Sequence, residues 1–155
     1  MTFKIQIYVD ADACPVKDET CRVAYRHEVP VVIVSNSHFR IPIHPLISRI
    51  VVSDAFDAAD DYIADKAQSG SIVVTSDILL ADRCLKAQAS VLAPNGRAFT
   101  EDSIGSAVAT RAIMTDLRAG METENIGGPP PFTKSDRSRF LSSLDELLNR
   151  LKRQV

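Results

Sequence analysis

The feature that most constrains the fold is the alternation of short β-branched runs with longer segments of helical periodicity. The strand-like runs are residues 5–9, 31–34, 49–53, 72–76 and 90–93. Helices are expected over residues 15–28, 58–68, 78–88, from 100 or 102 to about 119, and 136–153. Strands joined through helices pair in parallel and are covered on both faces. The pattern therefore predicts a three-layer α/β domain with a mostly parallel central sheet and C-terminal helices.

The 155 residues are expected to form one domain, residues 1–155, because this length supports a single hydrophobic core. Residues 119–135 contain three glycines and three consecutive prolines. Such a composition cannot continue a helix or a central strand, so it predicts a long exposed loop. Residues 136–153 then place Phe140 and several leucines at helical spacing, which predicts an amphipathic closing helix. The closing helix is expected to pack on its own domain, and the alternative is a helix that binds a partner.

Charge and cysteine content exclude several classes of protein. A net charge of −2 gives no bulk attraction to nucleic acid or membrane, so any binding of anions must be local. No apolar stretch approaches the roughly 18 residues of a membrane-spanning helix. Three cysteines, an odd number, and the lack of an apolar leader predict free thiols and a cytoplasmic protein. No feature of the sequence predicts an oligomeric state.

Aspartates follow three of the predicted strands, and Asp54 and Asp57 are those that come after the run at 49–53. Asp10 and Asp12 close the first strand-like run, and Asp77 follows the run at 72–76. Parallel strands end at one edge of the sheet, the carboxyl edge, where ligands of open α/β sheets bind. These carboxylates are therefore expected to share a site. Because several acids together repel anions unless a divalent cation neutralises them, the sequence predicts a Mg²⁺ or Mn²⁺ site.

A second acidic group opens the predicted helix at 58–68. Asp60 and Asp61 lie in its first turns and can face the strand ends, and Asp61 is the favoured ligand. Metal-dependent nucleases use such clusters because a divalent ion orients an attacking water and stabilises charge on the phosphate. The alternative is structural. Acids in a first turn favour the helix dipole, Asp57 can be a plain N-cap, and acids after strands can be solvated loop residues.

Four separated motifs, in this order, resemble the YaiI/YqxD family of uncharacterised bacterial proteins. They are Val9–Pro15, Phe56–Asp61, Thr75–Ala81, and Gly127–Pro129 together with Asp136, Arg137 and Phe140. The resemblance covers nearly the whole chain. That family is similar in turn to PIN-domain and flap-nuclease-like folds, so the resemblance implies a PIN-like fold.

The resemblance also implies roles for particular acids. PIN-like nucleases carry acids after the first strand, within a central helix, and after the strand that ends in a Thr-x-Asp motif. Carried over by position, Asp10 is the first ligand, Asp61 or Asp60 is the helix ligand, and Asp77 is the Thr-x-Asp ligand. Asp82 is a candidate fourth acid.

Basic residues follow the Gly/Pro-rich loop. Lys134, Arg137 and Arg139 are expected to contact phosphates. The alternative is a solvated helix start with Ser135 as its N-cap. The resemblance implies an arginine at the position of Asn95, so either Arg97 takes over its phosphate contact or that contact is lost. Aromatic residues make up only 6% of the chain, with no Trp, so recognition is expected to depend on backbone charge rather than base stacking.

These features predict a divalent-metal-dependent nuclease that acts on RNA phosphodiesters. The alternative is a non-catalytic RNA- or protein-binding module that retains the acidic pocket. A full ligand set around one ion favours the enzyme, whereas acids satisfied by backbone amides favour the module. The Asp10-Ala11-Asp12 triplet also resembles the motif of haloacid-dehalogenase phosphatases, which use an aspartate nucleophile.

Overall fold

The computed structural model describes residues 5–11, 15–36, 40–41, 43–53, 58–105 and 133–154. The strands are β1 Gln6–Asp10, β2 Val31–Ser35, β3 Ile47–Val51, β4 Ser71–Val74 and β5 Ser90–Leu92. The helices are α1 Lys17–His27, α2 Ala58–Lys66, α3 Ile78–Lys86 and α5 Lys134–Gln154, and residues 101–105 are also helical.

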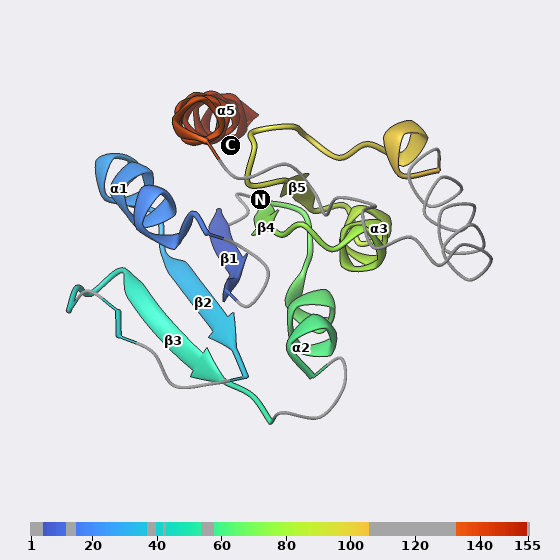
Figure 1. Cartoon of the computed structure of the whole chain (residues 1–155), viewed down its shortest axis with the longest axis horizontal. Helices are drawn as coiled ribbons and strands as arrows, with labels where there is room; N and C mark the ends of the chain where they lie inside the picture. Colours follow the sequence, from blue (N-terminus) through green and yellow to red (C-terminus); the bar gives the residue numbers. More distant parts are fainter. Residues whose placement is uncertain are drawn as a thin grey trace, which may run out of the picture.

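The five strands form one sheet in the order β3-β2-β1-β4-β5, and every neighbouring pair is parallel (Figure 1). The predicted α/β architecture with a mostly parallel sheet is confirmed. The central strand β2 is buried along its whole length, as a strand covered on both faces should be. The edge strand β3 instead exposes Ser48, Arg49 and Val51, and the polar side chains among them protect a sheet edge from pairing with another chain.

Two hydrophobic clusters fill the space on either side of the sheet. Alternation along β1 sends Ile7 and Val9 into one cluster and Tyr8 into the other. Helices α1 and α5 close the first cluster, and α2 and α3 close the second. Each fully buried large side chain contributes about 1.5–3 kcal/mol relative to exposure. The clusters therefore hold the layers together and fix where each strand ends.

Helix α5 closes the first cluster with an apolar stripe. Its fully or nearly fully buried residues are Phe140, Leu144, Leu147, Leu148 and Leu151. The prediction that this helix packs on the domain is confirmed. The predicted N-cap at Ser135 is wrong, because the Thr133 hydroxyl accepts from the Asp136 N–H at 3.1 Å and the Asp136 carboxylate accepts from the Thr133 N–H at 3.0 Å. This reciprocal pair satisfies two backbone donors at the start of the helix.

Other boundaries differ by a few residues. Strand β3 starts at Ile47 rather than 49, and α2 ends at Lys66 rather than 68. Thr100, rather than Asp102, caps the helix that follows β5, since its hydroxyl accepts from the Ser103 N–H at 3.1 Å. The remainder of that helix and most of the predicted loop at 119–135 lie outside the described residues. No described helix is both long enough and apolar enough to cross a membrane.

Candidate functional site

The site is defined by the point at which the strand order changes direction. From β1 the chain adds β2 and β3 on one side of the sheet and then crosses to add β4 and β5 on the other. Open α/β sheets bind ligands in the crevice outside the strand ends at such a point. Asp10 is the last residue of β1, and Asp77 follows β4 by three residues. The structure therefore places these two predicted acids at the carboxyl ends of adjacent central strands.

Asp10 is held by a hydrogen-bonded connection between β1 and β4. Asp10 is only 3% exposed. The Thr75 hydroxyl donates to Asp10 Oδ2 at 2.9 Å and accepts from the Asp77 N–H at 3.0 Å. Because Thr75 is fully buried, this connection is shielded from water and orients the Asp10 carboxylate. The Thr-x-Asp motif marked this position in the sequence, but sequence reasoning did not identify Thr75 as the partner of Asp10.

Valine in place of Thr75 should measurably destabilise the fold. It keeps the shape but leaves Asp10 without its hydroxyl donor and the Asp77 N–H without its acceptor, at a cost of about 1–3 kcal/mol. Denaturant unfolding measures this loss. Thr75→Ser is the matched control, because it keeps the hydroxyl and removes only a methyl group. A valine variant as stable as the serine variant would show that the hydrogen-bonded connection contributes nothing.

Asp77 has a structural role in addition to its position. Its Oδ1 accepts from the N–H groups of Leu79 at 2.9 Å and Leu80 at 3.3 Å, so Asp77 is the N-cap of α3. A carboxylate that accepts from backbone amides in this way is the arrangement expected of a binding module. A carboxylate has two oxygens, however, and a cap that uses Oδ1 is compatible with a ligand contact by Oδ2.

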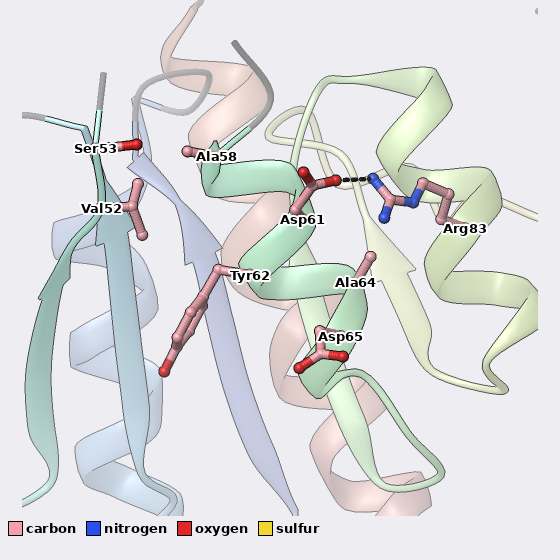
Figure 2. Close-up of a pocket in the computed structure, with 8 residues that line it drawn as sticks. All are labelled: Val52, Ser53, Ala58, Asp61, Tyr62, Ala64, Asp65 and Arg83. Carbon is pink, nitrogen blue, oxygen red and sulfur yellow. Dashed lines mark hydrogen bonds and ion pairs between the residues drawn. The ribbon is translucent and has the colours of Figure 1, made fainter. Parts of the chain in front are cut away.

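Asp61 faces an open hollow next to α2 (Figure 2). The hollow has a volume of about 850 Å³ and is lined by Val52, Ser53, Ala58, Asp61, Tyr62, Ala64, Asp65 and Arg83. Asp61 Oδ1 accepts from Arg83 Nη1 at 2.9 Å, and both side chains are largely exposed. Exposed ion pairs contribute only about 0–1 kcal/mol. The pair with Arg83 thus directs Asp61 toward α3 but holds it weakly.

Asp60 and Asp10 both influence the buried thiol of Cys84. The pKa of the Cys84 thiol on α3 is raised to about 11, mainly by burial. Arg83 opposes this rise, whereas the carboxylates of Asp60 and Asp10 add to it. Both acids therefore act on one buried thiol. Cys84 itself is protonated near neutral pH, so it is not poised as a nucleophile.

The remaining predicted acids differ in placement. Asp82 pairs with Lys86 at 3.0 Å on α3. Asp12, Asp54 and Asp57 lie outside the described residues. Within the part of the chain that the structure describes, no three His, Cys, Asp or Glu side chains form a group that could hold a metal ion. Asp10, Asp60 and Asp77 still supply the hard oxygen donors that Mg²⁺ prefers, and Mg²⁺ commonly binds through one or two carboxylates with waters and substrate phosphates completing its shell.

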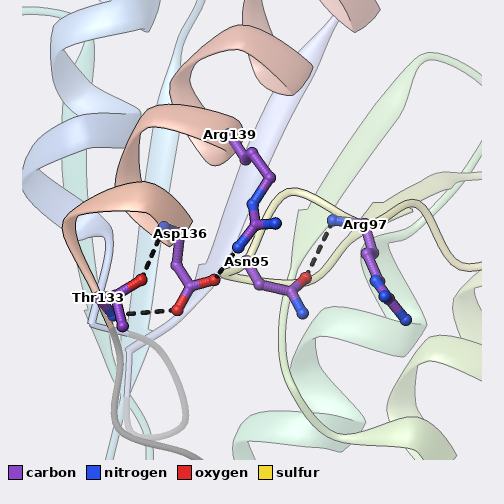
Figure 3. A network of polar contacts seen from close by, with 5 residues as sticks. All are labelled: Asn95, Arg97, Thr133, Asp136 and Arg139. Carbon is purple, nitrogen blue, oxygen red and sulfur yellow. Dashed lines mark hydrogen bonds and ion pairs between the residues drawn. The ribbon is translucent and has the colours of Figure 1, made fainter.

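The predicted basic residues gather at the same carboxyl edge. The loop after β5 contacts the start of α5, where a Cβ added at Gly96 would lie 2.7 Å from the backbone carbon and oxygen of Arg139. Figure 3 shows Asn95 between Arg97 and Arg139. The Asn95 side chain accepts from the Arg97 N–H at 3.0 Å, which fixes the loop. Asn95 thus shapes the backbone at this position.

Each basic residue of α5 has a defined setting. Lys134 is exposed at the first position of the helix. Arg137 Nη1 donates to Glu19 Oε1 at 2.9 Å, and Arg139 Nη2 donates to Asp136 Oδ1 at 2.6 Å. The backbone N–H of Thr133, with a smaller contribution from Arg139, lowers the pKa of Asp136 below its usual range. The Thr133 and Arg139 contacts favour the charged Asp136 carboxylate, and Asp136 in turn holds the first turn of α5.

Sheet topology and the acids at the strand ends are consistent with the PIN-like class of α/β proteins. The chain matches the family described as "Uncharacterized BCR, YaiI/YqxD family" over residues 8–150, and it belongs to that family. A UPF0178 protein of Sphingopyxis alaskensis is 69% identical over 147 residues, which is 95% of each chain. A UPF0178 protein of Rhodopseudomonas palustris is 56% identical, with 96% of this chain and 90% of the relative covered. No solved structure matches this chain significantly.

Proposed function

We propose that this protein is a divalent-metal-dependent nuclease that cleaves RNA phosphodiesters. The observation that carries the proposal is that acidic and basic side chains come from segments at the same carboxyl edge. Asp10 ends β1, Asp77 follows the neighbouring strand β4, and the backbone of α5 near its basic start contacts the loop after β5. Carboxylates that bind a cation beside cations that bind phosphate are the arrangement that phosphodiester hydrolysis needs.

Asp10, together with Asp77 or Asp60, would hold Mg²⁺ or Mn²⁺, because one or two carboxylates with waters and substrate phosphates can complete the shell of such an ion. Asp10 is the strongest candidate because its buried charge gains most from a cation. Asp60 is favoured over Asp61 because it is the less exposed of the two and because Asp61 pairs with Arg83. A bound ion would supply an activated water and would stabilise negative charge on the phosphate.

The basic residues would bind the RNA backbone. The chain has a net charge of −2, so attraction to RNA must come from this local group rather than from the whole molecule. Lys134 and Arg97 are exposed at the carboxyl edge. Arg137 and Arg139 each donate to a carboxylate, and a guanidinium has five N–H donors, so one edge can bind the carboxylate while another binds phosphate.

A binding module without catalysis is the second candidate. The observations that favour it are the two backbone amides that satisfy Asp77 Oδ1 and the ion pair that occupies Asp61. In that function the same basic residues would bind RNA, and the acids would serve the fold.

Mn²⁺ should raise the melting temperature and support cleavage. At about 100 times its dissociation constant, an ion bound only by the folded state adds about 2.7 kcal/mol. For a chain of this size that equals about 5–10 °C. Thermal melts in Mn²⁺, with EDTA and Na⁺ of equal ionic strength as controls, measure the first effect. Incubation with single-stranded and structured RNA measures the second.

The outcomes of this experiment separate the candidates. Stabilisation by Mn²⁺ with EDTA-sensitive cleavage supports the nuclease. RNA binding without cleavage or metal stabilisation supports the module. Release of inorganic phosphate without strand cleavage would indicate a phosphatase that uses an aspartate nucleophile. The absence of both RNA binding and metal stabilisation would contradict the nuclease and the module alike.

A further inference from the structure

Helices α1 and α5 are parallel neighbours whose starts lie at the carboxyl edge. Polar contacts join them in the same order along both helices: Glu19 to Arg137 near the starts, and His27 to Asp145, at 2.6 Å, near the end of α1. At that end Arg26 also pairs with Asp145, and Lys152 donates to the His27 carbonyl. Helix α1 begins at Lys17, soon after β1 ends. Because β1 ends at the carboxyl edge, the pair Glu19–Arg137 lies at that edge and the pair His27–Asp145 lies away from it.

Glu19 is an unusual residue for a purely structural position. Its side chain is only 9% exposed, and its Oε2 is buried without a hydrogen-bond partner. Removing a carboxylate from water costs several kcal/mol, and a single ion pair seldom repays that cost. An apolar side chain of similar volume is often neutral or stabilising at such a position. The stability of the fold therefore gives no reason for a glutamate here.

The ion pair with Arg137 offers an explanation for a buried glutamate at this position. The Arg137 side chain is 51% exposed, so its guanidinium reaches the surface. Its Nη1 donates to the buried Glu19 carboxylate. An arginine on the surface loses rotamer freedom when it is fixed by a ligand. An arginine that is already oriented by a carboxylate loses less when it binds a phosphate, because its planar group is held in advance.

We infer that Glu19 is a positioning residue, which orients the Arg137 guanidinium for contact with a phosphate of the RNA strand. The inference rests on the proposed function insofar as RNA is the ligand, but it does not require cleavage. It assigns the buried acid to substrate binding rather than to the metal. The charge of Glu19 by itself repels RNA. Simple electrostatics therefore predicts tighter RNA binding when the Glu19 charge is removed, whereas a positioning role predicts weaker binding.

Glu19→Gln should weaken binding of a single-stranded RNA about fivefold, although it removes a negative charge. Glu19→Met should weaken binding similarly while leaving the protein at least as stable as the wild type. Fluorescence anisotropy in EDTA measures RNA affinity without cleavage, and denaturant unfolding measures stability. Equal or tighter RNA binding by both variants would overturn the inference. Loss of affinity by a fully stable Glu19→Met cannot be explained by a merely structural role.

A double-mutant cycle tests that Glu19 acts through Arg137. Arg137→Gln should reduce the slope of log K against log salt by about 0.7, the value for one phosphate contact on a single strand. In the Arg137→Gln background, Glu19→Gln should not weaken RNA binding further. Additive losses of affinity would show that Glu19 acts independently of Arg137 and would overturn the inference.

Asp145→Ala is the matched control, because it removes the carboxylate that His27 and Arg26 contact at the other end of the α1–α5 pair. It should lower stability without changing RNA affinity. If it weakens RNA binding as much as Glu19→Gln does, the contacts only hold the helices together and the inference fails. If the wild type binds RNA without cleaving it, the nuclease proposal fails. A non-additive cycle would still support the positioning role of Glu19. A wild type that binds no RNA would overturn both, before any variant is compared.

Discussion

Asparagine in place of Asp10 should abolish Mn²⁺-dependent cleavage of RNA and leave the protein folded. Asparagine has the same shape, and its carbonyl oxygen can still accept from the Thr75 hydroxyl. It removes the negative charge through which the residue would hold a cation. A divalent ion contributes several kcal/mol to such a reaction, so the cleavage rate should fall at least about 10³-fold. Relief of repulsion between acids is expected to keep the metal-free variant as stable as the wild type.

Rates of RNA cleavage in saturating Mn²⁺, with an EDTA blank, measure this effect. Melting curves should show that the variant also loses its stabilisation by Mn²⁺. Asp65→Asn is the matched control, because it makes the same change on an exposed face of α2. Cleavage that survives Asp10→Asn, or that EDTA does not stop, would mean that a contaminant or a different mechanism is responsible.

Alanine in place of Gly96 should strongly destabilise the fold. Gly96 has a φ of +88°, which side chains with a Cβ rarely adopt. A Cβ there would also lie 2.7 Å from the Arg139 carbonyl carbon and oxygen and 2.9 Å from the Phe140 nitrogen. These are backbone atoms of α5, so they cannot move without moving the helix. Strain and overpacking together should cost about 2–4 kcal/mol.

Gly105→Ala is the matched control for this loss. Gly105 lies in the helical residues 101–105, and nothing lies within 4 Å of the position of an added Cβ. Alanine there should be neutral or stabilising by up to about 1 kcal/mol, because alanine favours helix over glycine. Denaturant unfolding of both variants gives the comparison. Equal stability of the two variants would show that the contact between the β5 loop and α5 is not tightly packed.

The sequence predicts the fold well where one kind of residue dominates an element. Strand β2 is an unbroken β-branched run, and its bounds are recovered almost completely. Strand β3 is shifted because its first residues do not form an apolar run: Ile47 is buried, but the polar Ser48 and Arg49 are exposed at the sheet edge. The start of α5 is shifted because Thr133 and Asp136 form the cap. Sequence spacing alone allows a cap at Thr133 or at Ser135.

The candidate site is predictable in its position but not in its details. Asp10 and Asp77 are found from the sequence because strand ends converge in any parallel sheet. The choice between Asp60 and Asp61 depends on how α2 packs, since successive residues of a helix point about 100° apart. The partner of Asp61 is Arg83, 22 residues further along the chain. Glu19 gives no signal in the sequence, because an acid in a first helical turn is ordinary.

The position of α5 has a consequence for the order in which the protein can fold during synthesis. Among the described elements α5 comes last in the sequence, yet Phe140, Leu144 and Leu148 pack in one cluster with β1 and α1, which come first. While the ribosome is still making the middle of the chain, α1 is the only described helix that can cover this face of the sheet. That face should be vulnerable to aggregation until α5 has emerged. Lys134, Arg137 and Arg139, three of the four residues proposed to bind RNA, arrive with the same helix, so most of the proposed phosphate contacts become available in the step that completes the core.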